Sequence, residues 1–141
     1  FVLSNGDKNA YARVSDVETL YKPNGTDPSD LVLRFLERND LKTKDIDLVI
    51  SGRSGDQRGD HWYDRLIDSH FQSTSEAVFK PLCGEYQSAI GFAFWMAAVA
   101  IRNGRIPEYS LFDSQAPKKI DRVLIYNHFQ ERNHAFILLE R

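Results

Sequence analysis

The stretch FKPLCGEYQSAIGFAFWMAAVAI, residues 79–101, has the most unusual composition in the chain. Its last thirteen residues, 89–101, contain no charged or hydrogen-bonding side chain except the indole of Trp95. A helix of that length rises about 20 Å, which is well short of the roughly 30 Å hydrocarbon core of a membrane. The stretch therefore predicts a helix that is apolar on all sides and buried in protein.

The overall composition is that of one globular domain. The chain has 141 residues, of which 42% are hydrophobic and 27% charged, enough to bury one core. Its formal net charge is −2, with no long run of one sign, so neither nucleic acid nor a charged membrane surface is expected as a partner. The single cysteine excludes an internal disulfide and agrees with a cytoplasmic location. No signal peptide is recognised, and because the first residue is Phe1 we expect a fragment or a processed chain.

Local signals place helices and strands in alternating order. Asp27 and Pro28 predict the cap and the first position of a helix, and Asp60 is expected to cap a second helix after a glycine-punctuated loop. The apolar helix is expected at 85–103, with Gly104 as its stop. Strands are expected on both sides of a turn at Asn5-Gly6 within residues 1–21, and then at 45–52, 76–80, 121–129 and 133–141.

This order of elements predicts an α/β fold with five strands in one mixed sheet and helices on both faces. Alternating strands and helices are typical of a mostly parallel sheet, and we expect the last strand to run antiparallel at one edge. The sequence contains no repeat and no linker, so residues 1–141 are interpreted as a single domain. A helix that covers a sheet needs only one apolar stripe. The second apolar side of the helix at 85–103 therefore predicts a further partner.

Three short motifs follow one another along the chain. They are DIDLVISGRSGDQRGD at 45–60, KPLCGEYQSAIG at 80–91 and HFQERNHAFIL at 128–138. Their order and spacing resemble the C-terminal half of β-ketoacyl-acyl-carrier-protein synthases, which belong to the thiolase-like superfamily. The resemblance runs from about Ala10 to the end, and residues 1–4 resemble the last strand of a missing N-terminal half. It implies a thiolase-like C-terminal lobe whose apolar helix packs between two sheets. The matching positions are Asp45, Ile46, Asp47, Gly59, Asp60, Lys80, Gly84, Ala89, Gly91, Phe129, Asn133 and Leu138.

The family's catalytic residues are replaced at the matching positions. The resemblance places its two catalytic histidines at Gly52 and Glu85 and its paired glycines at Gln130 and Glu131, while its nucleophilic cysteine belongs to the other half. In the family, the histidines donate hydrogen bonds to a thioester carbonyl and stabilise negative charge as a malonyl group loses carbon dioxide. Glycine has no side-chain donor and an ionised glutamate only accepts. The chain alone is therefore expected to be inactive.

Lys80 and Glu85 are the candidate catalytic residues. Lys80 matches the family's active-site lysine, or it forms an ion pair with Glu85 or another carboxylate. Glu85 either replaces the histidine functionally or is a first-turn glutamate suited to the helix dipole. Cys83 is either a thiol activated by the following helix or a small packing residue. The candidate substrate-binding positions implied by the resemblance are Gly52, Cys83, Gly84, Phe129 and Asn133.

Other kinds of site have weak signals. The four histidines, His61, His70, His128 and His134, lack the spacing of metal ligands, so neither a metal nor another cofactor is expected. The loop GRSGDQRG at 52–59 has glycines but lacks the lysine and hydroxyl residue that end a phosphate-binding loop.

The resemblance implies a ketosynthase-like C-terminal lobe for carbon-chain condensation, in fatty-acid or polyketide assembly with an acyl carrier protein. Because both histidines are replaced, we expect a divergent or non-catalytic member comparable to a chain-length factor. The alternative is a freestanding interaction or acyl-binding module that does no chemistry. The apolar helix is expected to pair with a missing N-terminal half or with a second copy in a dimer.

Overall fold

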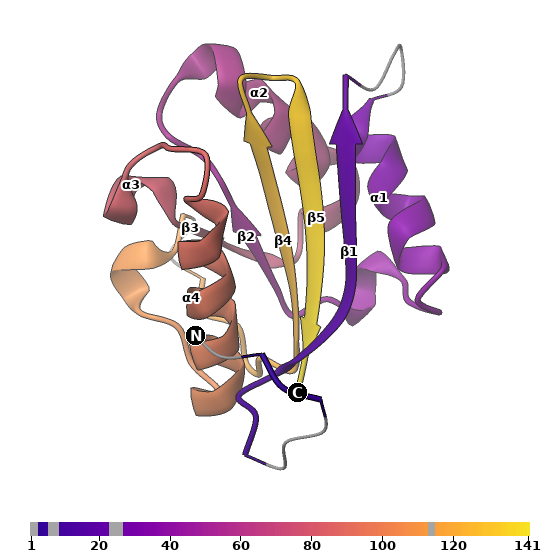
Figure 1. Cartoon of the computed structure of the whole chain (residues 1–141), viewed down its shortest axis with the longest axis vertical. Helices are drawn as coiled ribbons and strands as arrows, with labels where there is room; N and C mark the ends of the chain where they lie inside the picture. Colours follow the sequence, from indigo (N-terminus) through magenta and orange to yellow (C-terminus); the bar gives the residue numbers. More distant parts are fainter. Residues whose placement is uncertain (1–2, 6–8, 23–26, 113–114) are drawn as a thin grey trace.

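The computed structural model describes residues 3–5, 9–22, 27–112 and 115–141, and it arranges them as one sheet with helices on both faces (Figure 1). The strands are β1 (Arg13–Tyr21), β2 (Leu48–Ser51), β3 (Ser75–Val78), β4 (Arg122–Phe129) and β5 (Asn133–Glu140). The helices are α1 (Pro28–Glu37), α2 (Gln57–Leu66), α3 (Lys80–Cys83) and α4 (Ile90–Asn103), with short turns at η1 (Thr43–Asp45), η2 (Ile67–Phe71) and η3 (Glu108–Ser110).

The sheet has the strand order β1-β5-β4-β2-β3. β3 and β4 pair in parallel with β2, whereas β5 pairs antiparallel with both β4 and β1. The predicted five-stranded mixed sheet is confirmed, but the expected edge position of the last strand is wrong. Most of β5 is buried, so it needs a neighbour on each side, whereas the half-exposed pattern of β1 suits an edge.

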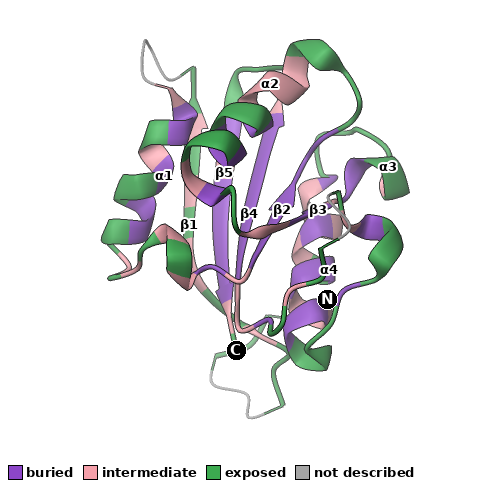
Figure 2. Ribbon diagram, turned by 180° about the vertical axis from the view of Figure 1, so that it is seen from behind, coloured by how far each residue is buried: buried purple, intermediate pink, exposed green. Residues whose placement is uncertain are grey.

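Two apolar cores lie on opposite faces of the sheet. α1 and α2 cover one face, where Phe35, Tyr63, Leu66 and Phe136 are fully buried. α4 covers part of the other face (Figures 1 and 2). In Figure 2 the sides of the helices that face the strands are buried and the outer sides are exposed.

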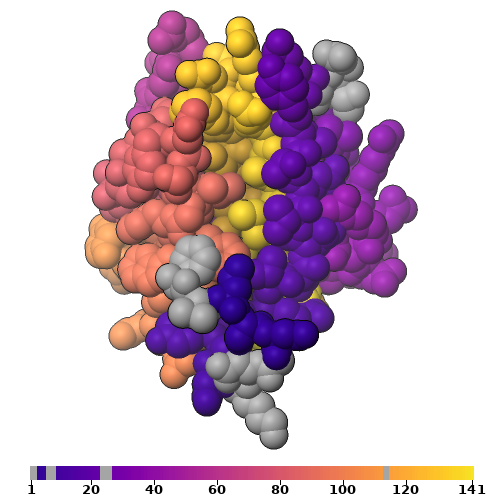
Figure 3. Space-filling view, viewed as in Figure 1, coloured from indigo at the N-terminus to yellow at the C-terminus, as the bar shows by residue number. Residues whose placement is uncertain are grey.

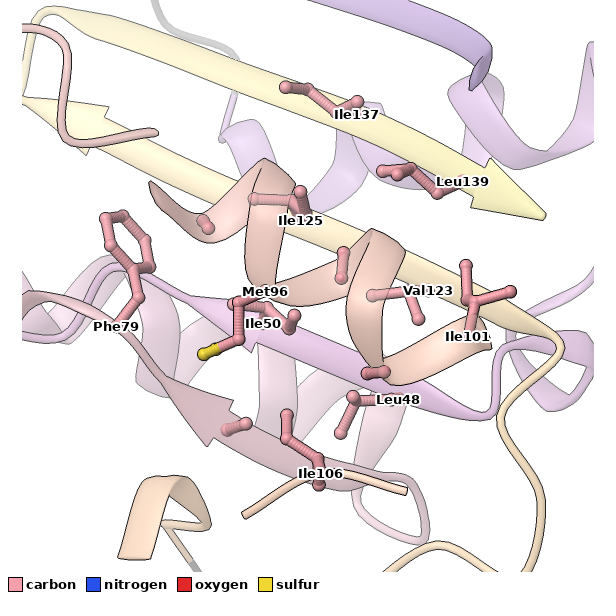
Figure 4. Close-up of a cluster of buried hydrophobic side chains, with 14 of the residues drawn as sticks. Leu48, Ile50, Phe79, Met96, Ile101, Ile106, Val123, Ile125, Ile137 and Leu139 are labelled. Atoms are coloured by element: carbon pink, nitrogen blue, oxygen red, sulfur yellow. The ribbon is translucent and has the colours of Figure 1, made fainter. Parts of the chain in front are cut away.

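α4 packs on the sheet through small side chains. Ala93, Ala97 and Ala100 are buried at helical spacing, so the helix lies close to the strands. Met96 and Ile101 of the same helix fill the space above β2 and β4 (Figure 4). The strand residues of the same core are Leu48, Ile50, Val123, Ile125, Ile137 and Leu139. The predicted buried helix is present; within the described residues its sheet-facing side is fully buried, most other positions are partly buried and Trp95 is exposed.

The ends of two helices agree with the sequence signals. Asp27 caps α1 and accepts a hydrogen bond from the Ser29 amide at 2.9 Å, with Pro28 at the first helical position. Gly104 follows α4 with a left-handed φ of 65°, a conformation that favours glycine. Both signals are local, because each acts through the backbone beside it.

Two predicted helix starts are wrong. α4 begins at Ile90 instead of residue 85, because Gly84 has a φ of 87° that ends α3 and the chain then turns before the helix. α2 is capped by Asp56, which accepts from the Arg58 amide, and not by Asp60. Asp60 lies inside the first turn and reaches back to the loop before the helix.

Of the two strands predicted within residues 1–21, the second is present as β1, whereas parts of the first strand and of the turn lie outside the described residues. Residues 1–2 and 6–8 lie outside the described ranges, and residues 3–5 are not in a strand. Over the described ranges, the helices are too short or too polar to span a membrane.

The alanine side of α4 yields a stability prediction. We expect Ala97→Leu to lower the free energy of unfolding by about 1–3 kcal/mol, because the added carbons meet strands that are already packed. Ala98→Leu is the matched control, since Ala98 is only partly buried and should cost clearly less. Urea unfolding of both variants measures the difference. Equal losses of unfolding free energy in the two variants would contradict the packing of the Ala97 side of α4 against the sheet.

Candidate functional site

A small polar pocket lies where the carboxyl ends of β2 and β4 meet the start of α2. Its volume is about 270 Å³. Its wall consists of Ser54, Asp56, Gly59, Glu85, His128, Phe129, Gln130 and Glu131. The carboxyl edge of parallel strands is where open α/β sheets usually bind ligands. A larger depression of about 620 Å³, between the end of α1 and η1, contains none of the predicted site residues.

Lys80 is buried beside this pocket. Its Nζ donates hydrogen bonds to Glu85 Oε1 at 3.0 Å and to the carbonyl of His128 at 3.2 Å. Only 3% of the Lys80 side chain is exposed, against 41% for Glu85. A buried ammonium requires partners of this kind. The ion pair with Glu85, one of the two roles considered for Lys80, is therefore present.

The turn around Glu85 excludes one reading of that residue. Since α4 begins at Ile90, Glu85 is not in the first turn of the apolar helix. Its carboxylate instead fixes the loop after α3 to Lys80. The expectation of a first-turn glutamate suited to the helix dipole is wrong.

Gly52 lies where other side chains have taken the available space. A Cβ at this position would lie 2.3 Å from Asn127 Oδ1, 2.6 Å from the Tyr63 hydroxyl and 3.0 Å from Lys80 Cε. The Gly52 amide is also fixed, because it donates to the carbonyl of Tyr126 at 3.1 Å. Position 52 therefore has no side-chain donor and no room for one.

Tyr63 connects these groups from α2. Its hydroxyl donates to Asn127 Oδ1 at 3.5 Å and accepts a hydrogen bond from the His128 amide at 3.1 Å. Burial raises the pKa of Tyr63 well above its ordinary value, so the phenol stays neutral. The Tyr63 ring stacks on His128 with 4.8 Å between centroids.

His128 is held as a neutral imidazole. Its Nε2 lies 2.8 Å from the carbonyl of Gly59, which can only accept, so Nε2 carries the proton. Within the described residues, Nδ1 is buried and has no hydrogen-bond partner. Burial lowers the pKa of His128 despite the hydrogen bond to Gly59. The ring is thus an acceptor at Nδ1.

His134 extends this aromatic group on β5. Its Nδ1 lies 3.0 Å from the Tyr126 hydroxyl, and its ring is 5.8 Å from that of His128. Burial, with a smaller contribution from His128, lowers the pKa of His134 to about 4. Across the described ranges, the histidines join no group of three or more residues placed to hold a metal ion.

The structure brings together only some of the predicted site residues. Glu85 and Phe129 line the pocket, and Lys80 and Gly52 lie directly beside it. Three others, Cys83, Gly84 and Asn133, do not line it.

Cys83 has the environment of a packing residue. It lies at the end of α3, and its thiol donates to the carbonyl of Gly84 at 3.4 Å. Burial raises the pKa of the thiol, which opposes formation of a reactive thiolate. The start of α4 is seven positions further along the chain at Ile90, so it does not activate the sulfur.

The turn between β4 and β5 keeps an unusual backbone. Gln130 and Glu131 have φ values of 51° and 54°, in the left-handed region. The resemblance places paired glycines here, and glycine adopts this conformation without strain, whereas other residues lose roughly 1–2 kcal/mol each. Gln130 and Glu131 therefore adopt the backbone conformation typical of glycine, and both residues line the pocket.

Comparison with known proteins identifies the fold but no sequence family. No family profile and no curated protein matches the sequence. In structure, the chain has the fold of part of ketosynthase and chain-length-factor proteins, which confirms the predicted α/β fold.

Three solved structures illustrate the likeness. Ketosynthase twelve of the bacillaene polyketide synthase from Bacillus amyloliquefaciens superposes on 93% of this chain with a TM-score of 0.71 and 12% identity. The PfaC keto synthase–chain length factor covers 93% with a TM-score of 0.74 and 15% identity. The ishigamide ketosynthase/chain length factor covers 92% with a TM-score of 0.69 and 17% identity. This chain spans only 30%, 18% and 38% of those chains, respectively.

The filled space at position 52 gives the second prediction. We expect Gly52→Ala to lower the free energy of unfolding by about 3 kcal/mol through overpacking. Gly91→Ala is the matched control, because a Cβ there meets nothing within 4 Å. It should be neutral or slightly stabilising.

Thermal unfolding of a double variant tests which group fills the space. Because the Asn127 amide is the nearest obstacle, Asn127→Ala combined with Gly52→Ala should recover part of the loss. If the losses of stability caused by Gly52→Ala and Asn127→Ala simply add, the close contact between positions 52 and 127 is contradicted.

Proposed function

We propose that this chain is the C-terminal lobe of a ketosynthase-like protein that takes part in carbon-chain condensation without supplying the chemistry itself, as a chain-length factor does. The observation that carries the proposal is the filled space at Gly52, where the resemblance places a catalytic histidine. A missing side chain alone would leave a gap that water or substrate could enter. Here Asn127, Tyr63 and the stem of Lys80 occupy it.

The second histidine position supports the same proposal. Lys80 pairs with Glu85 at 3.0 Å, and a glutamate carboxylate accepts hydrogen bonds and repels negative charge. A thioester enolate that forms during decarboxylation needs donors instead. Loss of one oxyanion donor typically costs a factor of about 10²–10³ in rate, and both donors are absent at these positions.

The uncovered face of the lobe supports pairing with another half-domain. Val14, Val17 and Tyr21 of β1 lie on the α4 side of the sheet, opposite the inward residues of β5, and all three are exposed. Trp95 of α4 is also 49% exposed. Figure 3 shows β1 and β5 open to the viewer beside α4. We call these exposed apolar residues, Val14, Val17, Tyr21 and Trp95, the open face, and exposed apolar side chains of this kind can mark an interface.

We therefore propose that the open face packs against an N-terminal half-domain, or against a second copy when the lobe is alone. The acyl carrier protein is the proposed partner that delivers the growing chain, in fatty-acid or polyketide assembly in the cytoplasm. The lengths of the similar proteins are consistent with a further half, because this chain spans less than half of each.

Self-association of the isolated chain is the third prediction. Light scattering at micromolar concentration should give a dimer mass, and Trp95→Asp should return it to a monomer by placing a charge in the interface. Tyr109→Asp is the control, since Tyr109 is 77% exposed on η3, outside the open face, and should leave the dimer intact. A monomeric wild-type chain at these concentrations would refute pairing through this face.

The fourth prediction concerns chemistry. With malonyl thioester, the chain should release carbon dioxide at the background rate, and Glu85→Ala should change nothing. A competent ketosynthase in the same assay is the positive control. Mass spectrometry after incubation with an acyl thioester should show no stoichiometric adduct on Cys83, because its thiol is mostly protonated. Release that collapses in Glu85→Ala would make this a working enzyme with a substituted site.

A further inference from the structure

His128 and His134 face each other at the end of the hairpin that β4 and β5 form. The two residues are directly opposite in the antiparallel register, and their rings are 5.8 Å apart. Only 5% of His128 and 2% of His134 is exposed. A charge on either ring would lose its hydration, and charges on both would repel each other. This arrangement therefore requires two neutral imidazoles.

The hydrogen bonds of the two rings suit the neutral form. His128 donates from Nε2 to the Gly59 carbonyl at 2.8 Å, and its Nδ1 is buried without a partner among the described residues. His134 Nδ1 lies 3.0 Å from the Tyr126 hydroxyl. An imidazolium carries a proton on both nitrogens. Protonation would therefore give His128 a buried N–H group that has no acceptor, which is costly.

The same two rings join the hairpin to the start of α2. Gly59 accepts the hydrogen bond from the His128 ring, and the Tyr63 hydroxyl accepts one from the His128 amide at 3.1 Å. Tyr63 also stacks on His128, with 4.8 Å between the ring centroids. Trp62 meets His134 edge-on at 5.4 Å. The contact between α2 and the end of the hairpin thus depends on both rings staying in place.

The surrounding charges do not compensate for the burial of the two rings. Lys80 opposes protonation of His128, whereas Glu85 and Glu131 favour it. Burial outweighs this attraction, so it lowers the pKa of His128 and lowers the pKa of His134 to about 4. The titratable groups around the two rings are Asp27 at the cap of α1, Asp56, Asp60, His61 and Tyr63 at the start of α2, Lys80, Glu85, Tyr126 and Glu131.

We propose that His128 and His134 form an acid-sensitive latch between the hairpin and α2. At neutral pH the two uncharged rings hold the turn at 130–131 against the start of α2. Under mildly acidic conditions the rings take up protons and move to solvent, and this end of the sheet opens while the rest of the lobe stays folded. Gly59, His128 and Glu131 all line the polar pocket, so the latch also controls the pocket.

The direction of the pH effect follows from the two protonation states. A histidine in an opened or unfolded chain takes up its proton near pH 6.5, whereas burial delays protonation of these two to lower pH. Opening therefore takes up protons, and it becomes more favourable as the pH falls below about 6.5. Paired carboxylates contribute only at lower pH, because their ordinary pKa values lie near 4. The latch thus acts between about pH 6.5 and pH 5.

Native-state hydrogen exchange of the whole chain tests the latch. The probe is the His128 amide, which is bonded to Tyr63 and is freed only when the hairpin separates from α2. From pH 7 to pH 5.5, each buried histidine should lower its protection factor about eightfold, and the pair about sixtyfold. This exchange should be insensitive to low urea concentrations, because a local opening exposes little surface. The Leu124 amide of the core should stay more protected and should respond to urea.

Two substitutions separate the latch from the rest of the protein. His128→Gln and His134→Gln each remove one titrating ring and keep a polar side chain. Each should reduce the pH effect on the amide at 128 from about sixtyfold to about eightfold, and the double variant should show almost none. His70→Gln is the matched control, because His70 is half-buried on η2, beyond the other end of α2, and should keep the full response.

Three results would overturn the latch. They are a His128 protection factor that does not fall between pH 7 and pH 5.5, exchange of this amide with the urea dependence of Leu124, and a double variant as sensitive to pH as the wild type. The first two are measured on the unmodified chain, so they hold even where a variant does not fold. None depends on decarboxylation or on dimerisation, so the latch goes beyond the proposed function and fails separately from it.

Discussion

The packing of the apolar helix α4 on the sheet is the contact on which one whole core depends, and within the described residues its sheet-facing side is the fully buried one. The alanines that face the sheet let the helix lie close to β2 and β4. Because of this short separation, α4 packs directly on Ile50 and Ile125 in one core. The larger aromatic side chains are correspondingly displaced outward, where Trp95 remains half exposed. The same sheet face continues over β1, whose valines Val14 and Val17 are exposed and are covered by none of the described helices. The same face of the sheet is therefore tightly packed under α4 and exposed over β1.

At the carboxyl edge of the parallel strands, the side chains around Gly52 are closely packed. Lys80, Asn127 and Tyr63 converge there from α3, β4 and α2, and they leave no volume for a further side chain. This convergence also uses up the available donors, because the Lys80 ammonium and the Tyr63 hydroxyl are both bonded internally. The pocket beside it is left with carboxylates and a neutral imidazole. A site that resembles one built to stabilise an anion thus carries the opposite electrostatic character.

The sequence predicted those features of the fold that depend on neighbouring residues. Asp27, Pro28 and Gly104 act on the backbone beside them, and the apolar runs of β2, β4 and β5 mark buried strands wherever they lie. The exact starts of α2 and α4 were missed, because two aspartates compete to cap one helix and a glycine turn precedes the other.

The site was predicted less completely than the fold. Lys80, Glu85, Gly52 and Phe129 were identified through motif spacing, and the structure brings them together. The roles of Tyr63 and His128 arise from contacts across 64 and 65 positions of the chain, which no local pattern records. A weak signal was present, since Asn127 and His128 are polar residues at the end of an otherwise apolar strand. That the space at Gly52 is filled follows only from the three-dimensional packing.

The position of β5 inside the sheet has a consequence for the order of folding. Arg13 on β1 and Glu140 on β5 pair across 127 positions of the chain. Contacts this distant require closure of a long loop, and they form slowly compared with local helices. During synthesis, β1 therefore emerges from the ribosome long before its neighbour and waits as an unpaired edge, open to other extended segments. Completion of the sheet therefore has to follow the translation of residues 133–140, which form β5.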